Sequence, residues 1–205
     1  MVSDRRRFPE PPPGEPFSPE EWRALDAAIA AGVGAVQLRD KDLDGRLLCA
    51  RAERLVARCR EAGVALLVND RVDVALAVGA DGVQLPATGL PTAAARELLG
   101  PDAIIGRSLH AADELEQARG ADFVVFGPVW DTPSKRAFGP PQGVERLAAL
   151  VRAASLPVIA VGGVTPERVA EVLRAGAAGV AAIGAILDAD DPGDVVRRFR
   201  DALAG

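Results

Sequence analysis

The feature that most constrains this chain is a repeated passage from a helix end, through glycine, into a short apolar run. Five stretches show it: AAGVGAVQL, EAGVALLV, AVGADGVQL, ARGADFVVF and RAGAAGVAAI. Glycine often ends a helix because it accepts a left-handed backbone conformation. Two further apolar runs, at 103–106 and 157–161, bring the expected strands to seven. Strands that alternate with helices predict a parallel sheet covered by helices.

The segments between these runs carry apolar residues at helical spacing, which predicts amphipathic helices. Three such stripes are Leu47, Leu48, Ala52, Leu55, Val56 and Cys59; Val169, Val172 and Leu173; and Val195, Val196, Phe199 and Leu203. Helix starts are predicted at Ser18-Pro19 and Thr165-Pro166, because a capping residue precedes a proline at the first helical position. Cys49 and Cys59 would lie about 15 Å apart along one helix, too far for a disulfide. We therefore expect both cysteines to be reduced.

Seven strand–helix units, with an eighth strand at residues 1–4, predict a single-domain α/β (β/α)8 TIM barrel over residues 1–205. The first strand is unusually short, since strands average about five or six residues. We expect either that this strand is truncated or that the true start of the protein lies a few residues upstream. The proline-rich residues 8–17 are expected to form the loop after the first strand. A doubly wound open sheet is the alternative. The lack of a Gly-x-Gly-x-x-Gly segment opening a helix weakens its dinucleotide-binding form.

Charge and hydropathy narrow the possible partners and the compartment. The net charge of −5 argues against a general nucleic-acid binder, although a few local cations can still hold an anionic ligand. No apolar run is long enough to span a bilayer, and the N-terminal MVSDRRRFPEPPPGEP lacks the apolar core of a signal peptide. We expect a cytoplasmic protein with neither nucleic-acid nor membrane partners.

In a barrel of this kind, binding and catalytic groups lie at the carboxyl ends of the strands and in the loops that follow. In chain order the candidates are Gln37, Arg39, Asp40, Lys41, Asn69, Asp70, Arg71, Gln84, Arg107, Ser108, His110, Gly162, Gly163 and Gly184. Each has a structural alternative as well. Asn69 and Asp70 are typical helix caps, and a lone histidine such as His110 is more often structural than catalytic.

One connection stands out, because FGPVWDTPSKRAFGPPQG, residues 126–143, is long for a loop between a strand and a helix. It carries two hydroxyls and two cations: Thr132, Ser134, Lys135 and Arg136. With Arg39, Lys41 and Arg71 these would surround one mouth, in which Asp70 is the acidic residue. Paired glycines at 162–163 would let backbone amides approach an anion. This inventory predicts a substrate with two separate phosphate groups and a Mg²⁺ ion.

Five stretches resemble the thiamine phosphate synthase and thiazole tautomerase superfamily and occur in its order, over nearly the whole chain. They are VQLRDKD (36–42), LLVNDRVDVALAVGADGVQL (66–85), IIGRSLH (104–110), FGPVWDTPSKRAFGPPQGVERL (126–147) and PVIAVGGVTPERV (157–169). The resemblance implies a thiamine phosphate synthase-type transferase of thiamine biosynthesis. Such an enzyme joins hydroxymethylpyrimidine pyrophosphate to thiazole phosphate and releases pyrophosphate.

The resemblance also implies a role for each matching residue. Gln37, Arg39 and Lys41 match positions that hold the pyrimidine and its pyrophosphate, and Asn69 and Asp70 match the pyrophosphate and Mg²⁺ positions. Ser108, Thr132, Ser134 and Lys135 match the pyrophosphate cradle, and Gly163 matches an amide that meets the thiazole phosphate. We therefore predict catalytic roles for Arg39, Ser108 and Lys135, substrate contacts that include Gly162 and Gly184, and Asp70 as the metal ligand.

Three residues depart from the superfamily patterns. Gly89 stands where the synthase usually has a second metal-binding aspartate, which predicts weaker metal affinity. Gly184 stands where synthases often have serine, and Pro128 where the tautomerase has histidine. Two alternatives therefore stay open: a tautomerase-like isomerase acting on a thiazole carboxylate phosphate, and a non-catalytic, regulatory binder of thiazole or thiamine phosphate. A homo-oligomer is also possible.

Overall fold

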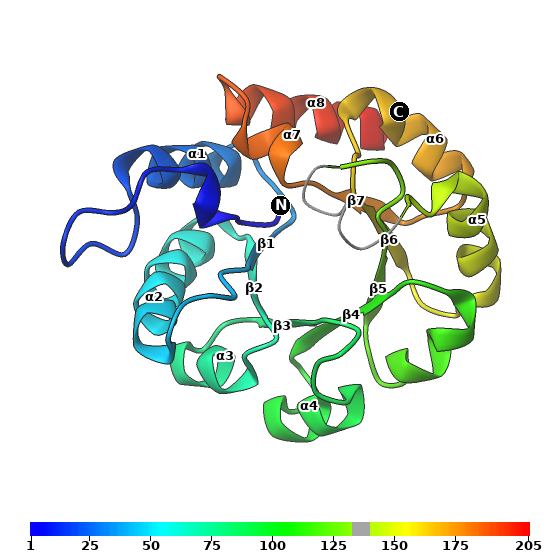
Figure 1. The fold of residues 1–205 in the computed structure, drawn as a ribbon, viewed down its shortest axis with the longest axis horizontal. Helices are drawn as coiled ribbons and strands as arrows, with labels where there is room; N and C mark the ends of the chain where they lie inside the picture. The colour runs from blue at the N-terminus through cyan, green and yellow to red at the C-terminus, as the bar shows by residue number, and fades with distance from the viewer. Residues whose placement is uncertain (133–139) are drawn as a thin grey trace.

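The protein is described by a computed structural model that covers residues 1–132 and 140–205, and its strands form one ring inside a ring of helices (Figure 1). All neighbouring strands are parallel, and their order in the sheet is their order in the chain. The strands are β1 (Ala35–Leu38), β2 (Ala65–Asn69), β3 (Gly82–Leu85), β4 (Ile104–Leu109), β5 (Phe123–Phe126), β6 (Val158–Val161) and β7 (Gly179–Ala181). A doubly wound sheet reverses its strand order at a switch point. The sequential order therefore excludes that alternative.

The predicted eighth strand is present as a short segment at the N-terminus. Val2 forms a parallel bridge with Gln37, and the Ser3 N–H donates to the carbonyl of Gln37 at 2.9 Å. On its other side, the Val2 N–H donates to the carbonyl of Ala182, just past β7, at 3.0 Å. This segment therefore occupies the first strand position between β7 and β1, as the chain's start near β1 in Figure 1 also shows. The prediction of a TIM barrel with a short first strand is confirmed.

The helices follow the strands around the outside of the ring. They are α1 (Pro19–Ala30), α2 (Gly45–Ala62), α3 (Val72–Val78), α4 (Thr92–Leu99), α5 (Gly143–Ala153), α6 (Val169–Arg174), α7 (Gly184–Leu187) and α8 (Pro192–Ala204), with short 3-10 turns η1 (Arg5–Arg7), η2 (Ala112–Ala118) and η4 (Pro166–Arg168). The predicted cap at Ser18 is confirmed, because its hydroxyl accepts from the Glu21 N–H at 3.2 Å. After Thr165, the chain first forms the 3-10 turn η4. The α-helix expected to start at Pro166 therefore starts three residues later, at Val169.

The core lies between the outer face of the strands and the inner face of the helices. In α2, the predicted apolar stripe is buried from Leu48 through Cys59, but Leu47 is an exception, since 42% of it is exposed. Cys49 and Cys59 are not bonded to each other, as expected. Burial raises the pKa of the Cys59 thiol to about 11, which makes it a packing group and a poor nucleophile. Among the described residues, the helices are all too short or too polar to cross a membrane.

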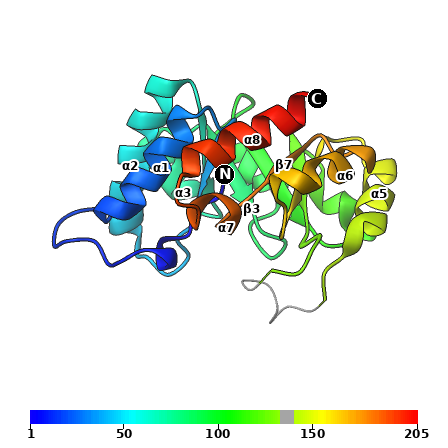
Figure 2. The same ribbon diagram turned by 90° about the horizontal axis from the view of Figure 1, so that it is seen from above.

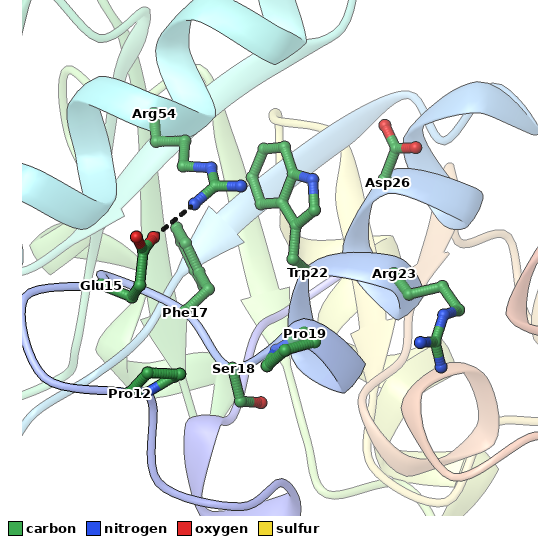
Figure 3. Close-up of a pocket in the computed structure, with 9 residues that line it drawn as sticks. All are labelled: Pro12, Glu15, Phe17, Ser18, Pro19, Trp22, Arg23, Asp26 and Arg54. Atoms are coloured by element: carbon green, nitrogen blue, oxygen red, sulfur yellow. Dashed lines mark hydrogen bonds and ion pairs between the residues drawn. The ribbon is translucent and has the colours of Figure 1, made fainter.

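The N-terminal loop at residues 8–17 leaves the barrel beside α1 and returns to it (Figure 2). Figure 3 shows how it is fastened. The ring of Phe17 lies 5.4 Å from that of Trp22, and the guanidinium of Arg54, from α2, lies 4.1 Å over Trp22. Glu15 pairs with Arg54 at 3.5 Å. These contacts surround an open hollow of about 430 Å³ between the loop, α1 and α2, on the outside of the barrel.

Candidate active site

A cavity of about 550 Å³ opens at the carboxyl ends of the strands, where the sequence places its candidate residues. The predicted residues that line it are Gln37, Arg39, Lys41, Asn69, Ser108, Thr132, Gly162, Gly163 and Gly184. Asp70 follows Asn69 directly but is not part of the lining. Ser134 and Lys135 lie outside the described residues, so their predicted roles stay predictions. The structure therefore brings together residues from almost every strand end that the sequence pointed to.

Two amide–polar pairs form the floor of the cavity across four neighbouring strands. The Gln37 side-chain amide donates to Asn69 Oδ1 at 2.9 Å, and that of Gln84 donates to Ser108 Oγ at 3.1 Å. Asn69 and Gln84 are aligned in the register of β2 with β3. Because each side chain is held by its neighbour, the floor presents fixed polar groups to a ligand. Gln84 was a strand-end candidate without an assigned role, and its position here gives it one.

Two cations rise from the loop after β1. Arg39 is half-buried, its backbone N–H donates to Ser3 Oγ at 2.9 Å, and burial lowers the pKa of its guanidinium. Burial, and then the nearby charge of Arg39, lower the pKa of the Lys41 ammonium. The lowered pKa values mean that neighbouring groups stabilise these two positive charges less well than water does. An anionic ligand beside them would stabilise both charges. Arg71 does not join them, because it pairs with Asp73 at 2.6 Å and is not part of the lining. Its predicted place at the mouth is wrong.

Asp70 lies at the edge of this group in an unusual backbone conformation. Its φ is +66°, the only positive value among the described residues other than glycine. Its backbone N–H donates to the Gln84 carbonyl at 3.0 Å, which fixes the turn between β2 and α3. The carboxylate is exposed and makes no hydrogen bond or ion pair within the described ranges. It is therefore available to a ligand.

The loop after β3 packs against the Asp70 carboxylate. A β-carbon on Gly89 would lie 2.6 Å from Asp70 Oδ1 and 2.8 Å from Pro86 Cδ. Arg107, another strand-end candidate, is buried and donates to the carbonyls of Ala87 at 2.9 Å and Leu90 at 2.8 Å. Arg107 therefore holds this loop in place and does not line the cavity.

The opposite side of the cavity is made by glycines. Gly162 and Gly163 have φ values of +92° and +67°, and a β-carbon on either would clash with Pro128 or Trp130 of the loop after β5. Within the described part of the chain, the N–H groups of both glycines donate to no partner. The Gly163 carbonyl is taken by Arg168, whose guanidinium lies 5.0 Å from the Trp130 ring. Two free amides at a cavity wall suit a phosphate oxygen.

His110 also lines the cavity, as one of the candidates with a structural alternative. Its Nδ1 lies 3.0 Å from the carbonyl oxygen of Gly127, which immediately precedes Pro128. A carbonyl can only accept, so this contact requires the proton on Nδ1. The ring is exposed and anchored to the backbone of the loop that begins after β5.

Sequence reasoning missed five charged residues that line this cavity: Arg6, Arg7, Asp131, Arg168 and Asp188. A signal for the first two was present. The run RRR at residues 5–7 directly follows the first strand, and the strand-end rule applied to the other strands would have included it. Arg168 and Asp188 lie several residues past their strands, and no comparable signal marks them.

A thiamine monophosphate synthase family model matches residues 14–186. The chain belongs to this family. A thiamine-phosphate synthase of Roseiflexus castenholzii is 44% identical over 182 residues, covering 88% of this chain and 80% of that protein. A "thiamine biosynthesis bifunctional protein ThiM/ThiE" of Symbiobacterium thermophilum is 49% identical over 181 residues. The match covers 87% of this chain and 38% of that longer protein.

The structural comparison agrees with the sequence comparisons. A thiamine phosphate pyrophosphorylase from Pyrococcus furiosus superposes with a TM-score of 0.85 and 33% identity, covering 99% of this chain and 93% of that one. The family model, the curated relatives and the solved structure together support an enzyme of thiamine biosynthesis, a thiamine-phosphate synthase. The family that the sequence motifs suggested is confirmed.

Proposed function

We propose that this chain joins hydroxymethylpyrimidine pyrophosphate to thiazole phosphate, forming thiamine phosphate and pyrophosphate. One observation carries the proposal: a single cavity combines the cations Arg39 and Lys41 on one side with the amides of Gly162 and Gly163, which donate to no described residue, on another. Two anion-binding regions that flank a polar floor suit two phosphorylated substrates bound side by side. A regulatory binder of one phosphate would need only the glycines.

The chemistry requires charge stabilisation and alignment. The bond between the pyrimidine methylene carbon and the pyrophosphate oxygen breaks, and both electrons leave on oxygen. The thiazole nitrogen then donates its lone pair to the cationic carbon, which forms the new C–N bond. Arg39, Lys41 and the Ser108 hydroxyl stabilise the leaving charge, and the polar floor holds the pyrimidine so that the nitrogen and carbon are close. No proton has to be removed by a side chain before the new bond forms.

Asp70 is the proposed ligand for Mg²⁺. Its carboxylate is exposed and pairs with none of the described residues, which fits this role, because Mg²⁺ is commonly held by one or two carboxylates together with substrate phosphate oxygens. When bound, Mg²⁺ would neutralise part of the pyrophosphate charge. The described residues hold no cluster of three or more acidic, histidine or cysteine side chains that could bind a metal by themselves. The proposal therefore includes the substrate as a source of ligands.

Incubating the purified chain with both substrates and Mg²⁺ tests the reaction. We expect thiamine phosphate and pyrophosphate to appear in equal amounts and neither to form when one substrate is left out. The tautomerase alternative is tested in parallel with a thiazole carboxylate phosphate as the only substrate. Absence of thiamine phosphate at saturating substrates and metal would refute the proposal, and isomerisation of the carboxylate would support the alternative.

A Lys135→Ala variant tests the predicted role of the loop after β5. We expect turnover to fall by about 100-fold or more, because a cation placed at a leaving group contributes through electrostatic stabilisation of the transition state. The melting temperature should change little. Arg119→Ala, at a residue whose side chain is 85% exposed, is the control and should leave both quantities unchanged. A loss of activity that is matched by an equal loss of stability would indicate a structural role for Lys135.

A further inference from the structure

Arg7 and Asp188 form an ion pair between the two ends of the chain, at the cavity. Arg7 belongs to η1, which follows the first strand, and Asp188 caps the end of α7, which follows β7. Arg7 Nη1 donates to Asp188 Oδ2, and both residues line the cavity. The Arg7 side chain is only 23% exposed. No step of the proposed reaction has yet used this cation.

The pair lies directly over Gly184. A β-carbon on Gly184 would be 2.7 Å from Asp188 Oδ2 and 3.1 Å from Arg7 Nη1. The two side chains fill the space that a side chain at 184 would need, so the ion pair can form in this position only because residue 184 is glycine. The Arg7 guanidinium is thereby placed against the loop that follows the last strand.

When the N-terminal segment is counted as the first strand, the Gly162–Gly163 loop follows the seventh strand and the Gly184 loop follows the eighth. Barrels of this type frequently bind phosphate between those two loops. Arg7 therefore lies on the side of the cavity where a phosphate group is expected. Its charge would add to the free amides of the glycines.

Arg7 has donors to spare for such a group. Its Nη1 is taken by Asp188 and its Nε is buried and faces Asp4, but Nη2 donates to none of the residues that the structure describes. Asp4 Oδ2 lies 3.6 Å from Nε, which is within ion-pair range but beyond a good hydrogen bond. A guanidinium flanked by two carboxylates is held in a fixed orientation, which leaves the N–H groups of Nη2 to donate to a phosphate.

We propose that Arg7 binds the phosphate of the thiazole substrate and that Asp188 is a positioning residue that aims the guanidinium at it. The proposal rests on the proposed function for the identity of this phosphate. The competing explanation is that the pair only fastens the N-terminal segment to α7. In that case Arg7 would matter only because it neutralises Asp188.

Kinetics with each substrate varied in turn distinguish these explanations. For Arg7→Ala we expect the KM for thiazole phosphate to rise by about 10-fold or more, the typical cost of a lost charged hydrogen bond. The KM for the pyrimidine pyrophosphate should stay within about 2-fold, because the lost contact is on the other substrate. Asp188→Asn should raise the thiazole phosphate KM to a smaller extent. Arg5→Ala is the matched control, since Arg5 lies in the same turn, pairs with Glu10 and Asp42, and does not line the cavity.

The double variant Arg7→Ala/Asp188→Ala gives the decisive comparison. If Arg7 binds phosphate, the double variant keeps the raised KM. If Arg7 only neutralises Asp188, the KM returns to the wild-type value, and the proposal is overturned. Equal increases in both KM values would overturn it as well.

A binding measurement separates this proposal from the synthase reaction itself. Calorimetric titration of wild type and Arg7→Ala with thiazole phosphate alone requires no turnover. We expect about 10-fold weaker binding for the variant and equal, weak binding of the unphosphorylated thiazole to both proteins. Should the chain prove inactive as a synthase, this difference would still establish the contact. Equal affinity of the two proteins for thiazole phosphate would refute it.

Discussion

An Arg51→Ala variant is expected to lose about 3–5 kcal/mol of the free energy of unfolding, because two buried carboxylates would lose their cation. The Arg51 side chain is 3% exposed and lies in α2. Its Nε donates to Asp40 Oδ2 at 2.8 Å, and its terminal nitrogens donate to Glu21 and, at 2.5 Å, to the carbonyl of Pro16. Urea denaturation of the variant and the wild type measures the difference.

The destabilisation should shrink at lower pH. Burial raises the pKa of the Glu21 carboxyl, and its bonds to Arg51 only partly offset this effect. Without Arg51 the folded-state pKa rises further. A carboxyl whose pKa is higher in the folded state binds more protons there, so stability falls as pH rises. The gap between variant and wild type should therefore be smaller at about pH 5 than at about pH 7.5.

Two further variants make the interpretation specific. Arg54→Ala, in the same helix, removes a 38% exposed guanidinium from Glu15 and should cost about 1 kcal/mol or less. Replacing the whole cluster with apolar residues, Glu21→Leu, Asp40→Leu and Arg51→Met together, should recover most of the loss, since no unpaired charge is left buried. If Arg51→Ala costs no more than Arg54→Ala, the cluster is not important for stability.

This cluster also bears on the site. Asp40 lies between Arg39 and Lys41 in the chain, and its side chain is buried against Arg51 while theirs line the cavity. Because Asp40 is fixed on the face of the loop that packs against α2, its neighbours Arg39 and Lys41 are held on the face that lines the cavity. The sequence presented Asp40 as a strand-end candidate, and the structure assigns it to this internal support.

The barrel could be predicted because its determinants are local. Helix ends, glycines and apolar runs repeat along the chain, and the strand-end rule then places Gln37, Asn69 and Ser108 at one face without knowledge of their contacts. The rule says nothing of where a long side chain turns after it leaves the backbone. Arg71 turns back to Asp73, two residues on, and so misses the cavity.

Other features depend on closure of the ring, which joins distant parts of the chain. Arg7 and Asp188 are separated by 181 positions, and they meet only because the N-terminal segment is inserted between β7 and β1. The pairing of Gln84 with Ser108 depends on the register of β3 with β4. Neither the closing contact nor the register leaves a local pattern in the sequence. These residues could therefore be named as candidates but not paired.

The carboxylate of Asp70 is the proposed Mg²⁺ ligand. Asp70→Asn should lower turnover by about 100-fold or more and raise the Mg²⁺ concentration needed for half-maximal rate, since it removes the proposed carboxylate from a developing negative charge. Asparagine is nearly the same shape and tolerates a positive φ, so folding should be preserved. Asp73→Asn, a carboxylate three residues away that pairs with Arg71, is the matched control and should leave the Mg²⁺ dependence unchanged.

The converse change follows from the neighbouring glycine. A β-carbon of Gly89 would lie 2.6 Å from Asp70 Oδ1 and 2.8 Å from Pro86 Cδ, so Gly89→Asp would bring a second carboxylate beside the first once the Asp70 side chain rotates and the Pro86 ring shifts. Two carboxylates hold Mg²⁺ more tightly than one. The half-saturating Mg²⁺ concentration should therefore fall in Gly89→Asp and rise in Asp70→Asn. If neither variant shifts it, the proposed Mg²⁺ role of Asp70 is wrong, and the pyrophosphate charge is balanced by the cations of the cavity instead.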